Sequence, residues 1–191
     1  MKLYFSHTSP YARKVRAVAI EHGLSLDLEE AFPLEDTLYP INPLGRIPAL
    51  VTDDGTLLVD SPVICEFLDH LGGGGLFPPP GPARWEALRR QALGDGLMDS
   101  AVPWRQELMR PEAQRSHGWT QRRRRQIETT LEYLQNLDLG AVDIGSLAVA
   151  CGVDYLRFRF PEEPWAERFP ALFRWFDRFS QRESLATTAP R

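Results

Sequence analysis

The chain contains few of the residues from which disulfide frameworks and metal centres are built. Among 191 residues there are two cysteines, Cys65 and Cys151, far apart and each in an apolar setting. This placement favours free buried thiols in a reducing compartment over disulfides. The four histidines are scattered without ligand spacing, so no metal site is predicted.

Long apolar runs are also missing. No stretch approaches the ~20 apolar residues that a membrane-spanning helix needs. The N-terminus does not read as a signal peptide, because Lys2 is followed by a short strand-like run and then by polar residues. We therefore expect a cytoplasmic protein with no membrane partner.

Neither sign of charge is in large excess. The net charge of -4 argues against a general nucleic-acid binder. The run Arg122 to Arg125 would encircle a helix, because successive helical residues point about 100° apart. Arg124 is also placed to pair with Glu128 one turn later. A solvated face is the better interpretation, and no nucleic-acid partner is predicted.

The first 75 residues carry alternating strand and helix signals. Two strands with a helix between them predict a parallel βαβ unit, and the two strands and helix that follow predict a ββα unit. The expected elements are a strand at 2–6, a helix at 10–22, a strand at Leu24, Leu26 and Leu28, a helical turn around Leu34 to Leu38, strands at 49–51 and 56–59, and a helix from Pro62 to Leu71 with Ser61 as its N-cap.

A stretch rich in glycine and proline then separates two regions of different character. We predict a first domain over residues 1–75, a linker over 76–83 and a second domain over 84–191. The second domain should be all helical, because apolar residues recur at helical spacing throughout it. Its expected helices cover 84–109, 119–137, 143–160 and 170–181.

The junction between the first strand and the first helix has the features of an anion site. Ser9 suits an N-cap and Pro10 the first helical position. Backbone N–H groups at a helix start favour an anion there. Ser9 therefore has two possible roles at this point: a helix cap worth ~1 kcal/mol and nothing more, or a ligand-binding hydroxyl.

Three segments, taken together and in order, resemble a known family: Ser9-Pro10-Tyr11-Ala12 with Arg13, Asn42-Pro43-Leu44-Gly45-Arg46-Ile47-Pro48, and Asp60-Ser61-Pro62. They are similar to the three glutathione-site segments of the cytosolic glutathione S-transferases, especially bacterial members with Thr-Ser-Pro at this junction. The resemblance covers nearly the whole chain. It implies a thioredoxin-like α/β N-terminal domain, an all-α helical-bundle C-terminal domain, glutathione as co-substrate, and a homodimer, for which Phe32 is a candidate contact.

The resemblance also implies roles for individual residues. Ser9 would donate a hydrogen bond to the glutathione sulfur and stabilise its thiolate, as the catalytic residue. Ile47, before a cis Pro48, would pair with the cysteinyl backbone, and Arg46 would reach the glycine carboxylate. Asp60 would take the α-amino group, and Ser61 the γ-glutamyl carboxylate.

The second substrate would be a small electrophile, expected to be apolar, held between the domains. Tyr11, Trp104 and Arg105 are the candidates for lining its pocket. An enzyme thiol is not expected to take part, because neither Ser9 nor Ala12 is a cysteine. The alternative is a non-catalytic module of the same fold that binds glutathione or a protein partner, since one fold serves many functions.

One departure from the family concerns the core helix of the second domain. The family often begins this helix with Ser or Thr and places Asp three residues later, whereas here Asp143 comes first and Ser146 follows. An Asp cap with Ser at the third position can still satisfy the exposed N–H groups. We interpret this as a reversed folding signal.

Overall fold

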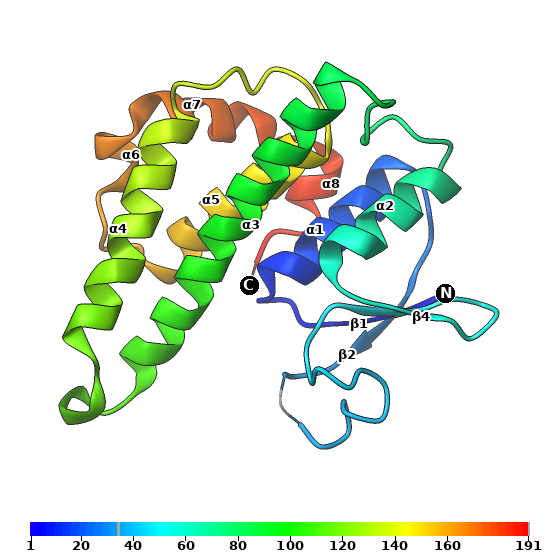
Figure 1. The fold of residues 1–191 in the computed structure, drawn as a ribbon, viewed down its shortest axis with the longest axis horizontal. Helices are drawn as coiled ribbons and strands as arrows, with labels where there is room; N and C mark the ends of the chain where they lie inside the picture. The colour runs from blue at the N-terminus through cyan, green and yellow to red at the C-terminus, as the bar shows by residue number, and fades with distance from the viewer. Residues whose placement is uncertain (34, 191) are drawn as a thin grey trace.

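The computed structural model describes residues 1–33 and 35–190. Its first part is a βαβ-ββα unit, as predicted (Figure 1). The four strands form one sheet in the order β2-β1-β3-β4, with β1 parallel to β2 and antiparallel to β3. The elements of this part are β1 (Lys2–Phe5), α1 (Pro10–Glu21), β2 (Asp27–Glu30), β3 (Ala49–Val51), β4 (Leu57–Leu58) and α2 (Ser61–Leu71).

The second strand lies later than the leucine alternation suggested. Leu24 and Leu26 pack against the core before the strand begins, and pairing with β1 starts only at Asp27, opposite Lys2. All four residues of β2 are exposed, because it is the edge strand, and Leu28 is 44% exposed. The predicted helical turn around Leu34 includes a residue outside the described part of the chain.

The start of α2 is also one residue earlier than predicted. Asp60, not Ser61, is the N-cap, and its backbone is extended. The Asp60 carbonyl already accepts a hydrogen bond from the Ile64 N–H at 3.0 Å. Because this bond is the first of the helix, Ser61 takes the first helical position.

The second part of the chain is helical, as predicted. The long helices α3 and α4 run antiparallel, with α5 behind them (Figure 1). Three short helices, η1, α6 and α8, were not predicted. The elements are α3 (Pro82–Met109), η1 (Glu112–Gln114), α4 (His117–Leu134), α5 (Ile144–Arg159), α6 (Trp165–Arg168), α7 (Pro170–Phe179) and α8 (Glu183–Ala186). The domain limits at residues 75, 76–83 and 84 stay a prediction.

Helix α5 is the centre of this helical part, since most of its residues are buried. Glycines allow its backbone to approach α3 closely. A Cβ at Gly94 would lie 2.5 Å from the carbonyl carbon of Ala148, and one at Gly145 would lie 2.5 Å from the Ala87 carbonyl oxygen. Within the described residues, no helix is long and apolar enough to cross a membrane.

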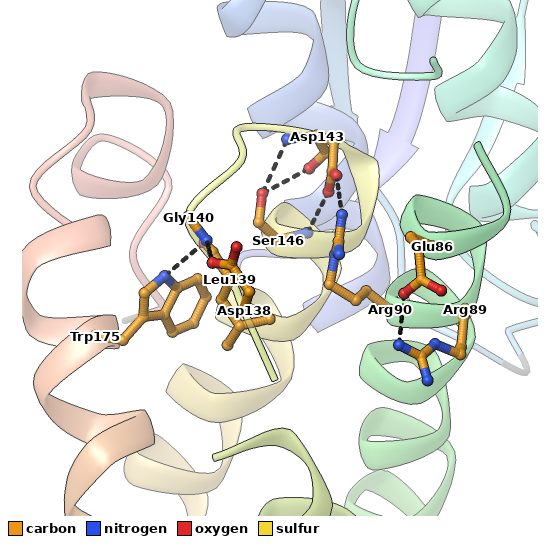
Figure 2. Close-up of polar contacts among 9 residues, drawn as sticks. All are labelled: Glu86, Arg89, Arg90, Asp138, Leu139, Gly140, Asp143, Ser146 and Trp175. Carbon is orange, nitrogen blue, oxygen red and sulfur yellow. Dashed lines mark hydrogen bonds and ion pairs between the residues drawn. The ribbon is translucent and has the colours of Figure 1, made fainter. Parts of the chain in front are cut away.

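The N-terminus of α5 is capped from both sides, as Figure 2 shows. The Asp143 carboxylate accepts from the Ser146 N–H at 2.9 Å, and the Ser146 hydroxyl oxygen accepts from the Asp143 N–H at 3.0 Å. Arg90 of α3 donates to the other carboxylate oxygen of Asp143. The predicted reversed capping signal is confirmed, and it also ties α5 to α3.

Replacing Asp143 by Ala should lower the free energy of unfolding by about 2–3 kcal/mol, because it removes a cap and leaves the Arg90 guanidinium without its carboxylate. Asp138 offers a matched control, since among residues 1–33 and 35–190 its exposed side chain accepts only from the Gly140 N–H. Asp138→Ala should cost less than about 0.5 kcal/mol. Urea unfolding measures both. Equal losses would contradict the structural role given to Asp143.

Glu21, at the end of α1, accepts hydrogen bonds from Arg182, the N-cap residue of α8, and from Ser184 in its first turn. These bonds hold the pKa of Glu21 below its ordinary value of 4.5, against the opposing effect of burial. A carboxylate with a lowered pKa stabilises the fold above its ordinary pKa, and that stability is lost as the pH falls through the lowered value.

Glu21→Gln should therefore lower the free energy of unfolding by about 1–2 kcal/mol at pH 7, and the difference from the parent protein should shrink at pH 3. Unfolding curves at both pH values test this. Glu29→Gln, which removes an exposed pair with Lys2, should change stability by less than about 1 kcal/mol. A Glu21 effect that is the same at both pH values would be inconsistent with the lowered pKa.

Candidate functional site

Ser9 is the N-cap of α1. Its hydroxyl oxygen accepts from the Ala12 N–H at 3.2 Å, and its carbonyl accepts from the Arg13 N–H at 3.0 Å. Pro10 occupies the first turn of the helix, where no N–H partner is needed. The hydroxyl proton of Ser9 is not used by these contacts. The side chain is half-buried, so it can still donate to a bound molecule.

The loop before β3 is held by Asn42. Its buried side chain donates to the Arg46 carbonyl at 2.7 Å and accepts from the Leu44 N–H at 3.0 Å. The Ile47–Pro48 peptide bond is cis, as the resemblance implied. Among the described residues, no hydrogen bond involves the N–H or C=O of Ile47. The Arg46 side chain is exposed.

The third segment is the start of α2. Asp60 is exposed, and within residues 1–33 and 35–190 its carboxylate has no hydrogen bond or ion pair. Ser61 is 2% exposed at the first position of an 11-residue helix. The first N–H groups of such a helix, together with a free carboxylate beside them, can take an anion and a cation side by side.

The strand register brings these three segments to one end of the sheet. Tyr4 of β1 lies opposite Ala49 of β3, so Pro48 follows beside Phe5. Leu50 lies opposite Leu58, so the same antiparallel register continues toward Asp60. Segments that are about 40 and 50 residues from Ser9 in sequence therefore meet where α1 begins.

Two buried cations of α1 connect this end of the sheet to the helical part. Arg13 is 3% exposed; it donates to the Asp154 carboxylate of α5 at 2.5 Å and to the Leu185 carbonyl of α8 at 3.1 Å. Lys14 is 0% exposed and pairs with Asp95 of α3 at 2.5 Å. Burial raises the pKa of Asp95, although the Lys14 charge opposes this.

The residues suggested for the electrophile pocket lie in different surroundings. The Tyr11 hydroxyl donates to Asp99 of α3 at 2.5 Å, and burial raises the pKa of this hydroxyl. Trp104 is 6% exposed and stacks on Phe160 with ring centroids 4.2 Å apart. Arg105 is partly exposed. That these three residues line one pocket stays a prediction.

A small pocket lies beside Ser9, where the start of α1 meets α5 and the C-terminal segment. Its lining residues are His7, Thr8, Ser9, Pro10, Arg13, Cys151, Tyr155 and Pro190. The contribution of α5 was missed in the sequence. The helix at 143–160 was predicted, but its position relative to Ser9 depends on how two distant segments pack.

Both cysteines are free and buried, as predicted. Burial raises the pKa of the Cys65 thiol to about 12 and that of Cys151 to about 11. At neutral pH both thiols are therefore protonated. Since only the thiolate is strongly nucleophilic, neither cysteine is suited to be a nucleophile, although Cys151 lines the pocket beside Ser9.

Known proteins match this arrangement. A family model described as "Glutathione S-transferase, N-terminal domain" matches residues 8–71. The uncharacterized GST-like protein YibF of Escherichia coli strain K12 is 33% identical over 100% of this chain and 98% of its own. This chain belongs to the glutathione S-transferase family.

Solved structures of family members agree with this assignment. A member from Pseudomonas fluorescens Pf-5 with bound glutathione has a TM-score of 0.96 and is 36% identical, covering 100% of this chain and 98% of its own. A further structure from the same organism holds S-(propanoic acid)-glutathione; it has a TM-score of 0.92 at 37% identity and covers 100% of both chains. The thioredoxin-like domain and helical domain predicted above are thus those of a glutathione S-transferase fold.

Proposed function

We propose that this protein is a glutathione transferase that stabilises the glutathione thiolate at Ser9 and joins its sulfur to a small electrophile. The observation that supports this best is the register of the sheet, which gathers Ser9, the cis Ile47–Pro48 bond and Asp60 at one end. The glutathione bound to the Pseudomonas relative supports the same ligand for this chain. The electrophile would enter from the helical side, near Tyr11, Trp104 and Arg105.

The reaction requires an ionised thiol. A free thiol with a pKa of ~8.5 is only about 3% ionised at pH 7. Lowering the pKa by about two units ionises roughly three-quarters of it, which requires ~2.7 kcal/mol of preferential stabilisation of the thiolate. A hydrogen bond from the Ser9 hydroxyl, aided by the N-terminus of α1, is of this order. The thiol proton passes to solvent, and the sulfur electron pair forms the new C–S bond. One bond at the attacked carbon breaks at the same time: its electron pair departs with a leaving group or, where the sulfur adds to a double bond, moves to the neighbouring atom, which then takes a proton from solvent.

The rest of glutathione has matching partners. The free carboxylate of Asp60 suits the α-amino group, and the N-terminus of α2 with Ser61 suits the γ-glutamyl carboxylate. The unused N–H and C=O of Ile47 suit the cysteinyl backbone, which would add to the sheet like a short strand. The exposed Arg46 guanidinium would reach the glycine carboxylate.

We further propose a homodimer in the cytoplasm. Large apolar side chains are exposed on α2 and at the start of α3: Val63 is 48%, Leu71 51% and Trp85 69% exposed. Arg84, next to Trp85, pairs with Glu66 of α2, so these exposed side chains belong to neighbouring surfaces. Phe32, at 52% exposure, stays a candidate contact. Apolar groups gathered in this way favour a protein partner.

Replacing Ser9 by Ala should raise the pKa of bound glutathione by about two units, toward the free value. The ultraviolet absorbance of the thiolate, titrated with glutathione bound, measures this pKa. Tyr11→Phe is the matched control, because it removes a neighbouring hydroxyl that donates to Asp99 instead, and the thiol pKa should be unchanged. A low pKa that survives in Ser9→Ala would mean that Ser9 is only a helix cap.

Calorimetry with glutathione, beside a conjugation assay, separates the enzyme from its alternative. Saturable binding with turnover of electrophiles supports the transferase. Binding without turnover of any of several electrophiles would favour a non-catalytic binding module. Absence of binding would contradict the glutathione site itself.

Trp85→Glu should convert a dimer into a monomer of about 21.7 kDa, because it places a charge in the proposed interface. Light scattering after size-exclusion chromatography measures the mass. Met109→Glu is the matched control, since Met109 is also 69% exposed but lies at the other end of α3. A parent protein that is already monomeric, or a Trp85→Glu variant that remains dimeric, would contradict this interface.

A further inference from the structure

One face of α5 lines the pocket beside Ser9 and continues past it toward the C-terminal end of the helix. Cys151 and Tyr155 both line this pocket and lie one turn apart. Arg159 follows Tyr155 by one more turn on the same face, because residues four apart are neighbours on a helix surface. Its guanidinium lies 5.9 Å from the centre of the Tyr155 ring and 4.4 Å from that of Phe158. A positive charge is thus held beside the pocket.

A second arginine lies on α3, next to the residue that packs on the end of α5. Trp104 stacks on Phe160, the residue after Arg159, so that this part of α3 is fixed against the end of α5. Arg105 follows Trp104 directly. Burial raises the pKa of Tyr155, while the charge of Arg159, a hydrogen bond from Arg159 and the charge of Arg105 oppose this rise.

Neither Arg105 nor Arg159 has an acidic partner in the described residues, whereas three other arginines of α1, α3 and α5 or their ends do. Arg157 of the same helix pairs with Asp177, and Arg110, the C-cap residue of α3, pairs with Glu107. Arg13, which also lines the pocket, forms an ion pair with Asp154. The Nε of Arg159 is buried and has no hydrogen-bond partner among residues 1–33 and 35–190.

We propose that Arg105 and Arg159 bind a carboxylate on the second substrate, so that the enzyme takes anionic electrophiles rather than purely apolar ones. This rests on the proposed function, because it places the carboxylate on the molecule that glutathione attacks. Guanidinium groups are suited to the role, since they stay charged and donate in a planar fork that matches a carboxylate. Tyr155, between the arginines and Ser9, would pack against the body of the substrate.

Binding of conjugates tests the proposal without requiring turnover. The probes are S-carboxymethyl- and S-(2-carboxyethyl)-glutathione, each compared by calorimetry with its carboxamide counterpart, which has the same shape without the charge. The parent protein should bind at least one acid about tenfold more tightly than its amide. In Arg159→Gln and in Arg105→Gln this preference should fall to within about twofold, and the affinity for glutathione itself should be unchanged.

Arg157→Gln is the matched control, because Arg157 lies on the same helix but already pairs with Asp177; the acid preference should persist in it. Equal affinity of the parent protein for acids and amides, or a preference that survives in Arg159→Gln and Arg105→Gln, overturns the proposal while leaving the glutathione site intact. An equal loss of affinity for glutathione would assign the arginines to a carboxylate of glutathione and also overturn it. No binding of glutathione by the parent protein would overturn the proposed function together with this inference.

Discussion

The pairing of two buried cations on α1 with carboxylates of the helical part is the constraint on which the rest of this structure depends. Arg13 with Asp154 and Lys14 with Asp95 join a helix of the α/β unit to α5 and α3. Charges removed from water are costly unless they are paired. Separating the two parts of the chain would therefore leave these charges without their partners. The position of α1, and with it Ser9, is therefore fixed from the helical side as well as from the sheet.

This constraint explains how the site draws on both parts of the protein. The end of the sheet supplies backbone groups, the Asp60 carboxylate and two helix N-termini. Together these groups suit a peptide that carries both a positive and a negative charge. The helical part supplies Tyr155 to the pocket beside Ser9, and in our proposal Arg105 and Arg159 add positive charge next to it. Because α1 is held by both parts, Ser9 lies beside Tyr155 of α5 at a pocket that both residues line.

The two roles of Ser9 considered from the sequence are compatible in the structure. The hydroxyl oxygen accepts from the Ala12 N–H as a cap should. A hydroxyl has one donor and two acceptor positions, so its proton remains available to a thiolate. Capping and thiolate stabilisation can therefore be separated by experiment, because one contributes to the stability of the fold and the other to the pKa of the ligand.

Local patterns in the sequence determined the order and type of the main elements, the capping of α5 by Asp143 and Ser146, and the pairing of Arg124 with Glu128 at 3.1 Å. These features depend on neighbours within a few residues, which is why spacing alone predicts them. The family resemblance proposed residues for a glutathione site, which stay a prediction, and the strand register explains why their segments meet. Only the tertiary structure decided that Lys14 is buried against Asp95, 81 residues away, and that α5 brings Cys151 and Tyr155 beside Ser9. A basic residue on a helix has the same local signature whether it faces solvent or a distant carboxylate, so these partners become visible only when the helices pack.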